Sequence, residues 1–455
     1  MLNGRIHRFE KGGLRILLDV PSGAVHVVDE ITWDVMEYYD GTNAAELPVL
    51  LAGRYSEEEI NDVLAELREL QSKGVLLGAE AKPVEVFNAP AIIKSLCLHI
   101  SHDCNLRCGY CFAGSGNFGG ERTMMTKEVG RQAIDFLIAN SGGRRNSEID
   151  FFGGEPLLNF DTVRDLIDYG NKQAALHDKE FKFTLTTNAL LLNDDIIAYL
   201  NDHKVSMVLS LDGRPEVHDR MRPTCGGGGS YAAVQPKISK LVESRNNQGY
   251  YVRGTFTKLN MDFDADVQHM AELGYQQLSV EPVVGEDETY AFAEQDLPKL
   301  YAAYDRLAEV YLEQQREGRG FNFFHFNLDL SKGPCVAKRL AGCGAGHEYF
   351  AVTPIGDLYP CHQFVGREEF KMGDVWQGMT EPELSMKFRR THIFNKQECP
   401  ECWARYYCSG GCHANAEAFN QDITKPYKMG CELQKHRLEC AIMIQARLAL
   451  ENNNT

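Results

Sequence analysis

The sequence predicts an α/β protein: an open, partial barrel of six βα units that follows a small domain and precedes a cysteine-rich segment. Three observations predict this fold class. Strand-like and helix-like segments alternate from Ile92 onward, as they do around a parallel sheet. The length of 455 residues indicates about three domains. All of the 14 cysteines except Cys225 fall within residues 97–111 or 335–440, so two parts of the chain are expected to carry metal or redox chemistry.

The composition is that of a folded chain, with 44% hydrophobic and 24% charged residues. The net charge of −17 disfavours nucleic acids and anionic membranes as partners. Met1–Gly13 lacks the apolar segment of a signal peptide, and no apolar run approaches the length of a membrane span. We therefore expect a cytoplasmic protein that binds neither nucleic acid nor membrane, with cysteines that hold metal rather than disulfides.

The segment up to about Gly78 is expected to form strands followed by helices. Leu14–Asp19 and Ala24–Val28 flank a Pro-Ser-Gly turn, which is typical of a strand pair. Apolar residues then recur at helical spacing, and Ser56 with the three glutamates after it predicts a helix start. Lys73–Leu77 is expected to add a short strand.

This segment resembles the winged-helix RiPP recognition element, the domain that binds leader peptides of ribosomally made, modified peptides. The resemblance implies a recognition domain over residues 1–80, joined by a linker over residues 81–91. Such a domain binds an extended peptide by adding it as a strand to an exposed sheet edge. The alternative is a domain that only packs on the enzyme, with a small molecule as substrate, because turn and period signals do not encode function.

The barrel is expected over residues 92–320. Its predicted strands are Ile92–Ile100, Glu148–Phe152, Phe181–Thr186, Val205–Leu211, Tyr251–Phe256 and Gln277–Val280. Six βα units fall short of the eight that close a full barrel. Chemistry in parallel sheets gathers at the carboxyl ends of the strands, so residues there are candidate site residues.

The loop after the first barrel strand carries three cysteines, spaced four and then three positions apart: Cys104, Cys108 and Cys111. Three such thiolates can hold three irons of a cubane cluster and leave the fourth iron open. Zinc is the alternative, with His99 or His102 as the further ligand that it would need. The CxxxCxxC run, with Tyr110 before its last cysteine, resembles the signature of the radical S-adenosylmethionine (SAM) enzymes.

Further residues match that family at the ends of the next strands. Gly153, Gly154 and Glu155 resemble its GGEP motif, in which glycines let backbone approach the cofactor and the glutamate accepts from the amine of SAM. The other residues that the resemblance implies as SAM contacts are Tyr110, Thr186, Asn188, Ser210, Asp212 and Arg222. Loop capping or surface ion pairs are the alternative roles. The four glycines at 226–229 are expected to form a flexible loop near the barrel mouth.

The tail contains the pattern CX12GX4C followed by CX2CX5CX3C and a last cysteine. The pattern resembles the SPASM domain, which implies that residues 321–455 carry two auxiliary 4Fe–4S clusters. The outer cluster would be held by Cys399, Cys402, Cys408 and Cys431. The inner cluster would be held by Cys343, Cys361 and Cys412. A pair of interleaved zinc sites is the alternative.

The inner set lacks a fourth ligand, which Cys335 could supply or a substrate thiolate could replace. Cys97, Cys225 and Cys440 have no assigned role, and a buried thiol packed as a small apolar side chain is the default expectation. His362 stands where sulfatase-maturating relatives carry an acid that acts as a base. It is a candidate base, with a structural histidine as the alternative.

Together the motifs resemble the radical SAM/SPASM peptide maturases, closest to the SCIFF maturase group, which installs thioethers of the sactipeptide and ranthipeptide type. The resemblance implies three 4Fe–4S clusters, SAM, an electron donor such as flavodoxin or ferredoxin, and a cysteine-rich precursor peptide with a leader. A 5′-deoxyadenosyl radical would remove hydrogen from a carbon that then joins a cysteine sulfur. Carbon–carbon crosslinking, sulfatase-type maturation and epimerisation are alternatives within this class. A non-catalytic zinc-binding interaction protein is the alternative from another class.

Overall fold

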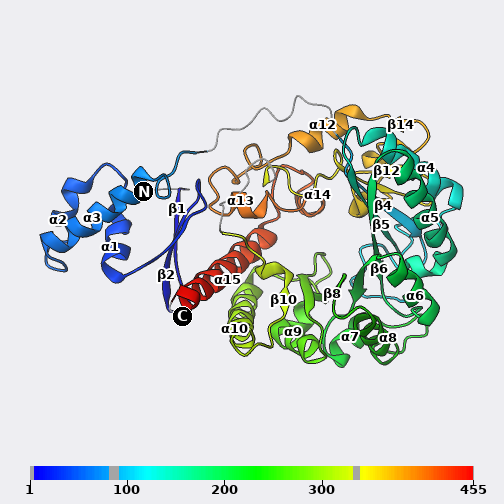
Figure 1. Cartoon of the computed structure of the whole chain (residues 1–455), viewed down its shortest axis with the longest axis horizontal. Coiled ribbons are helices and arrows are strands. Elements are labelled where there is room, and N and C mark those ends of the chain that lie inside the picture. The colour runs from blue at the N-terminus through cyan, green and yellow to red at the C-terminus, as the bar shows by residue number, and fades with distance from the viewer. Residues whose placement is uncertain (1–4, 81–91, 331–338, 454–455) are drawn as a thin grey trace.

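The computed structural model describes residues 5–80, 92–330 and 339–453 (Figure 1). A small N-terminal domain lies at one end of the molecule, and a strand-rich barrel forms the other. The predicted linker over residues 81–91 lies outside the described residues. No helix in the described ranges is long and apolar enough to cross a membrane.

The N-terminal domain contains a three-stranded antiparallel sheet in the order β1-β2-β3. Its elements are β1 (Ile6–Lys11), β2 (Leu14–Asp19), β3 (Val25–Val28), α1 (Glu30–Tyr38), α2 (Leu47–Leu50) and α3 (Glu57–Ser72). The two strands expected around the Pro-Ser-Gly turn and the helix start at Ser56 are confirmed. Ser56 caps α3 through a capping box with Glu59.

The strand predicted over Lys73–Leu77 is wrong. This segment forms turns, because Gly74 and Leu77 adopt positive φ angles of 71° and 50°. Leu76 and Leu77 are buried, which explains the strand-like apolar pattern of this segment. Arg5 instead binds the carbonyls of Leu77 and Gly78 at 2.6 and 2.8 Å.

The N-terminal sheet is covered on both faces. Leu17 packs with the helices of its own domain, whereas Phe9, Ile16 and Leu18 belong to the main core of the molecule. The long helix α15 (Lys428–Asn453) contacts β1 and β3 and contributes to the same core (Figure 1). The N-terminal domain is therefore integrated into the body of the protein rather than tethered to it.

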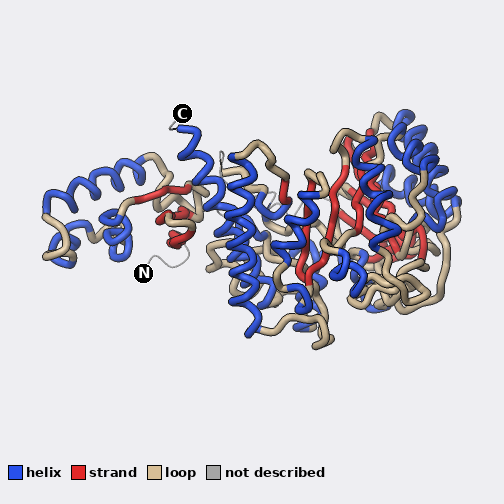
Figure 2. The backbone as a smooth tube through the Cα atoms, turned by 90° about the horizontal axis from the view of Figure 1, so that it is seen from below, coloured by secondary structure: helices blue, strands red, loops and turns tan. Residues whose placement is uncertain are grey.

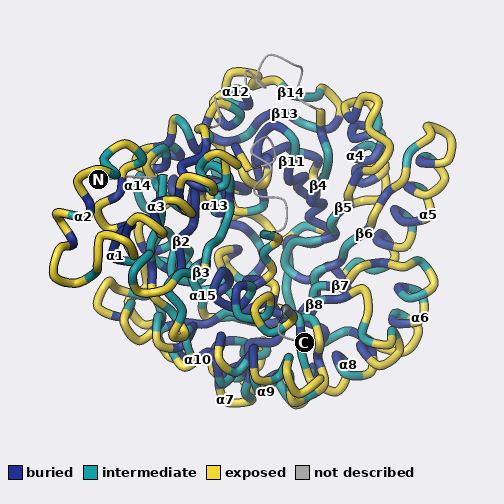
Figure 3. Tube along the Cα trace, turned by 60° about the vertical axis from the view of Figure 1, so that its left-hand side comes forward, coloured by how far each residue is buried: buried dark blue, intermediate teal, exposed yellow. Residues whose placement is uncertain are grey.

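The barrel consists of six parallel strands that alternate with helices, and the predicted strands are confirmed to within a few residues. The strands are β4 (Ser95–Ser101), β5 (Asn146–Gly153), β6 (Glu180–Thr187), β7 (Ser206–Ser210), β8 (Tyr250–Phe256) and β9 (Gln277–Pro282). The helices are α4 (Lys127–Asn140), α5 (Phe160–Leu176), α6 (Asp194–Asp202), α7 (Pro215–Met221), α8 (Tyr231–Ser244), α9 (Phe263–Glu272) and α10 (Leu297–Arg316). Figure 3 shows exposed helix surfaces outside the buried strands.

The sheet continues beyond the barrel strands at both ends. β10 (Asn322–Phe323) pairs with β9, and β11 (Tyr349–Val352) pairs in parallel with β4. β12 (Asp357–Tyr359), β13 (Gly373–Asp374) and β14 (Gly378–Met379) then add antiparallel strands. Because the order runs from β10 to β14 without rejoining, the barrel is open, as expected.

The rest of the tail is helical and irregular. Its helices are α12 (Pro382–Arg390), α13 (Arg405–Cys408), α14 (His413–Asn420) and α15. α15 packs along α10 before it reaches the N-terminal sheet. Because the tail supplies β11 to the barrel sheet, the tail and the barrel share one core.

Candidate active site at the barrel mouth

Cys104, Cys108 and Cys111 lie in one short loop after β4, at the carboxyl edge of the parallel sheet. The backbone N–H of Gly109 donates to Met221 O at 2.8 Å, and an isolated bridge joins Leu106 to Thr224. The glycine-rich loop that follows Thr224 therefore lies beside the cysteine loop at the mouth, as predicted.

The three thiols of this loop share one environment. Burial, together with the nearby Glu155, Cys108 and Cys111, raises the pKa of Cys104 to about 12. Burial likewise raises the pKa of Cys108 to about 11, against the opposing effect of Arg222. A bound cation would reverse these shifts, because coordination favours the thiolate.

The two glycines of the GGEP motif make room for the cysteine loop itself. A Cβ atom at Gly153 would lie 2.3 Å from Ser101 O, and one at Gly154 would lie 2.2 Å from Asp103 O. The N–H groups of Gly154 and Glu155 donate to the same two carbonyls at 2.7 and 2.9 Å. The backbone before Cys104 therefore packs directly against both glycines, where any side chain would collide with it.

Glu155 is buried and joins β5 to the end of β6. Its carboxylate accepts from Thr187 Oγ1 and Asn188 N, both at 2.8 Å, and from Leu157 N at 3.0 Å. Burial raises its pKa to about 7 in spite of these hydrogen bonds. Asn188 in turn donates to Asn105 Oδ1 at 2.7 Å, and its amide nitrogen lies 3.7 Å from Cys104 Sγ.

Tyr110, Asp212 and Arg222 form one cluster below the cysteine loop. The Tyr110 hydroxyl donates to Asp212 Oδ2 at 2.5 Å, and Arg222 Nε forms an ion pair with the same oxygen at 3.0 Å. The other carboxylate oxygen accepts from Thr255 N at 2.9 Å. Arg222, predicted to pair with the carboxylate of SAM, is thus paired with Asp212 within the protein.

Thr186 and Ser210 are half-buried near the ends of β6 and β7. Thr186 lies on the same face of β6 as Thr184, and Ser210 lies on the same face of β7 as Val208. Thr184 and Val208 line a cavity of about 460 Å³ together with residues of β8 and β9. Side chains two positions apart on a strand point to the same side. Thr186 and Ser210 therefore face the inside of the barrel.

The tail cysteines fall into the two groups that the resemblance implies. Burial, together with the nearby Cys408, Cys399 and Cys402, raises the pKa of Cys431 to about 12. Burial likewise raises the pKa of Cys361, as do Cys412 and Cys343. Cys335 lies outside the described residues.

Among the described residues, no three of the predicted cluster cysteines have all their sulfur atoms within 4.8 Å of one another. Among the described residues, one group of three or more His, Cys, Asp or Glu ligand atoms lies within 4.8 Å, and it contains none of the predicted cluster cysteines. Thiolates on one tetrahedral zinc lie roughly 3.8 Å apart, because each Zn–S bond is about 2.3 Å long. The predicted alternative ligands His99 and His102 instead hydrogen-bond each other at 3.0 Å.

The inner tail group lies next to the cysteine loop. The ring of His362, which follows Cys361, is centred 5.5 Å from Phe112, which follows Cys111. Burial lowers the pKa of His362 to about 4, and its Nδ1 lies 3.2 Å from the Tyr349 hydroxyl. The sequence analysis missed Phe112 and Tyr349, because only the pairing of β11 with β4 brings the two regions together.

The remaining thiols differ in exposure. Cys97 and Cys440 are buried, as expected. The same expectation is wrong for Cys225, which is exposed because the glycine-rich loop leaves it at the surface, 3.9 Å from Cys104 O.

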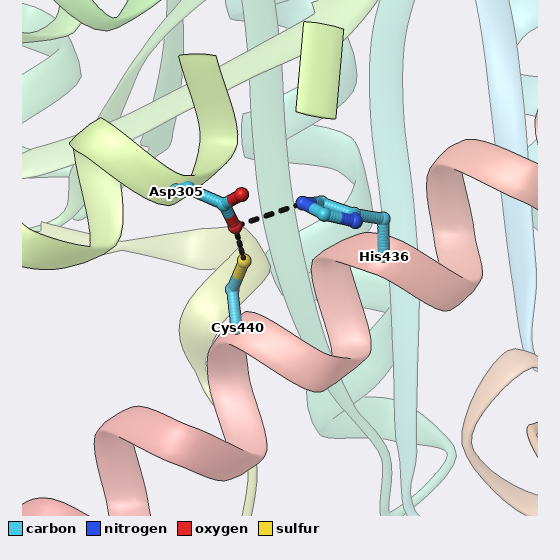
Figure 4. Close-up of side chains that lie close together, drawn as sticks. All are labelled: Asp305, His436 and Cys440. Atoms are coloured by element: carbon cyan, nitrogen blue, oxygen red, sulfur yellow. Dashed lines mark hydrogen bonds and ion pairs between the residues drawn. The ribbon is translucent and has the colours of Figure 1, made fainter. Parts of the chain in front are cut away.

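Cys440 belongs to the compact group Asp305, His436 and Cys440, which joins α10 to α15 (Figure 4). Lys11 Nζ of β1 lies 2.6 Å from Asp305 Oδ1 and 3.3 Å from His436 Nε2. The lysine ammonium thus supplies the cation that this group needs, so the cluster attaches the N-terminal sheet to the body.

The sequence model of the Radical SAM superfamily matches residues 98–274, which run from β4 through α9. The cysteine loop at the carboxyl edge of the sheet lies within the residues that this model matches. The family implies one 4Fe–4S cluster and SAM, and the grouped thiols at the barrel mouth fit a cluster.

Homologues of this chain are peptide and sulfatase maturases. The radical SAM cyclopropyl synthase TigE of Paramaledivibacter caminithermalis is 25% identical, over 94% of this chain and 92% of TigE. A cysteine-type anaerobic sulfatase-maturating enzyme of Clostridium novyi is 22% identical, over 71% of this chain and 90% of the enzyme. Streptococcus suis SuiB has a similar fold (TM-score 0.54, 17% identity, covering 94% of this chain and 98% of SuiB) and has been solved with SAM and with its precursor peptide SuiA.

Proposed function

We propose that this enzyme forms a thioether between a cysteine sulfur and a carbon of another residue in a ribosomally made, cysteine-rich precursor peptide. The contact between Phe112 and His362 is the observation that carries the proposal, because these residues directly follow Cys111 of the cysteine loop and Cys361 of the proposed inner set. Joining a thiol to a carbon removes two hydrogens overall. A second redox site beside the first is suited to accept the electron that remains after one hydrogen atom has been removed.

In this proposal Cys104, Cys108 and Cys111 hold the SAM-binding cluster, with SAM at the barrel mouth. When bound, the cluster and SAM supply a 5′-deoxyadenosyl radical that takes hydrogen from a substrate carbon. Gly153, Gly154, Glu155 and Asn188 are proposed SAM contacts; the first three also fix the loop, and Asn188 also orients its first cysteine. The other proposed SAM contacts are Tyr110, Thr186, Ser210, Asp212 and Arg222.

The tail, residues 321–455, is proposed to hold two further 4Fe–4S clusters. The outer set is Cys399, Cys402, Cys408 and Cys431, and the inner set is Cys343, Cys361 and Cys412. Their spacing supports clusters over zinc, because cubane clusters hold their thiolates further apart than one zinc ion does. Either Cys335 or a substrate thiol is the fourth ligand of the inner set. His362 remains the candidate base.

Residues 1–80 are proposed to bind the leader of the precursor by strand addition. β2 and β3 are antiparallel, so hydrogen-bonded and non-hydrogen-bonded residue pairs alternate along them. Asp19 and Ala24 form a hydrogen-bonded pair, in which Asp19 N donates to Ala24 O at 2.9 Å, and Leu17 with His26 is the next such pair. Val25 and Val27 therefore direct their N–H and C=O groups away from β2, toward the free edge of β3. Val27 and Val28 also line a groove of about 520 Å³, together with Glu10–Arg15 of β1, β2 and the turn between them. The peptide complex of SuiB supports a precursor peptide as the substrate class.

The test is anaerobic turnover of a cysteine-rich peptide encoded beside this gene, with SAM and a reduced flavodoxin or ferredoxin as electron donor. We expect 5′-deoxyadenosine and a product that is two hydrogens lighter per thioether. After treatment with a disulfide reductant, the bridged cysteine should resist alkylation by iodoacetamide. A product with unchanged mass would indicate epimerisation, and the absence of 5′-deoxyadenosine would refute the proposal.

The similarity to TigE, which covers most of both chains, makes carbon–carbon bond formation the second candidate. Such a product would also be two hydrogens lighter, but every cysteine would still react with iodoacetamide. Alkylation before fragmentation therefore separates the two reactions in one experiment.

A further inference from the structure

Lys396 is a buried cation in the cysteine-rich tail. Its side chain is 1% exposed, and Nζ donates to the carbonyl oxygen of Gly410 at 2.7 Å. A buried ammonium normally needs an anion, because a carbonyl alone does not offset the loss of hydration. Within the described residues, the largest effects that favour its charged form come from cysteine thiolates.

Gly410 lies between the two proposed cluster sites. It belongs to the loop that joins α13, which ends at Cys408 of the outer set, to α14, which begins after Cys412 of the inner set (Figure 1). Gly410 has a positive φ of 83°, and a Cβ atom there would lie 3.0 Å from Lys396 Cδ. The loop is thus shaped around the lysine stem.

The charge of Lys396 acts on both cysteine sets. Burial lowers the pKa of Lys396, whereas cysteines of both sets raise it: Cys399, Cys408, Cys412 and Cys431. Lys396 in turn lowers the pKa of Cys399 against the effect of burial. An iron–sulfur cluster with thiolate ligands carries net negative charge, and its reduction potential depends on nearby charge. The positive charge of Lys396 therefore suits a position between two anionic clusters, one at each cysteine set.

We propose that Lys396 is the shared counter-cation of the two auxiliary sites and raises the reduction potential of both. Reduction adds negative charge to a site, and a buried cation stabilises the reduced form more than the oxidised form. Both sites therefore accept an electron from the substrate more readily than they would without Lys396. This inference rests on the proposed function, because both tail sites must hold iron.

The test compares the full-length, iron-loaded variants Lys396→Met and Lys396→Arg with the wild type by redox titration followed by electron paramagnetic resonance. We expect Lys396→Met to lower the equilibrium constant for one-electron reduction of both auxiliary sites about tenfold, which is about 59 mV. Lys396→Arg keeps the charge and should retain the potentials. Loss of tail iron in Lys396→Met but not in Lys396→Arg would also support the proposal.

Lys435→Met is the matched control. Lys435 also lies near Cys402 and Cys431, but it is partly exposed and already pairs with Glu432 at 3.0 Å. Its removal should change the same equilibrium constants by less than about twofold. Unchanged reduction potentials in Lys396→Met would overturn the inference about Lys396 but not the proposed function. Equal decreases of the reduction potentials in Lys396→Met and Lys396→Arg would do the same. A wild-type chain with about four irons, enough for one cluster, would overturn the proposed function as well.

Discussion

The hydroxyl of Tyr110 donates to the carboxylate of Asp212 across 2.5 Å. This bond joins the cysteine loop after β4 to the residue that follows β7, and Arg222 completes the contact. The position of the three thiols therefore depends on a buried charge cluster three strands away in the sheet.

Tyr110→Phe should loosen the cysteine loop, because it removes a hydrogen bond to a buried carboxylate. We expect a loss of about 1.5–3 kcal/mol in the free energy of unfolding and slower SAM cleavage. Chemical denaturation and the yield of 5′-deoxyadenosine without peptide measure the two effects. Tyr199→Phe is the control, since its hydroxyl bonds Arg164 O at 3.2 Å on the outer helices. Equal effects of the two changes would contradict a special role for Tyr110.

Replacing the cysteines of one proposed cluster should remove the iron of that cluster alone. The wild type should bind about twelve irons with matching sulfide, as three 4Fe–4S clusters require. Cys108→Ala with Cys111→Ala should remove about a third of the iron and abolish SAM cleavage. Cys399→Ala with Cys402→Ala should remove a similar share but retain SAM cleavage without peptide. Metal analysis that finds zinc in place of iron in the tail would refute the auxiliary clusters.

Glu155 should make stability depend on pH. Its pKa is raised from 4.5 to about 7, so between these values the folded state holds a proton that the unfolded state has lost. The stabilising effect of this proton is fully present below pH 4.5 and is lost as the pH rises through about 7. We expect the stability difference between wild type and Glu155→Gln to change by up to about 3 kcal/mol across this window.

Chemical denaturation at closely spaced pH values measures this difference under anaerobic conditions. Subtracting the variant removes contributions that both proteins share, such as that of Asp150, whose pKa burial raises to about 6. Parallel curves for the two proteins would show that Glu155 does not titrate in this range.

Val27→Pro should block leader binding, because proline removes an N–H that points toward the free edge of β3. It should leave the sheet intact, since proline is tolerated on edge strands. We expect at least about a tenfold weaker affinity for the precursor peptide, measured by fluorescence anisotropy, with unchanged SAM cleavage in the absence of peptide. Val27→Ala, which keeps the N–H, is the control and should bind nearly as well as wild type.

Local sequence patterns predicted the barrel well. The six strands and the start of α3 follow from period, turn residues and capping, which act over a few positions. Lys73–Leu77 was mispredicted because two buried leucines in a turn look like a strand. Local pattern also could not show that Gly153 and Gly154 accommodate backbone, since their neighbours Ser101 and Asp103 come from the end of β4 and the loop after it.

The proposed cysteine sets rest on a different kind of evidence. Their spacing matches known motifs, so resemblance supplied the grouping that periodicity cannot give. The contact of Phe112 with His362 and the position of Lys396 between two sets depend on long-range pairing and packing. The residue types phenylalanine, histidine and lysine do not by themselves indicate these positions in the sequence.

α15 also has a consequence for biosynthesis. It follows the N-terminal domain in the chain and so leaves the ribosome later, yet it contacts β1 and β3 and shares one core with Phe9, Ile16 and Leu18. Until α15 has been made, these apolar side chains lack part of their native packing, and the N-terminal domain exposes an apolar face. Completion of the N-terminal domain therefore awaits the synthesis of α15, and shortening α15 would destabilise this domain as well as the tail.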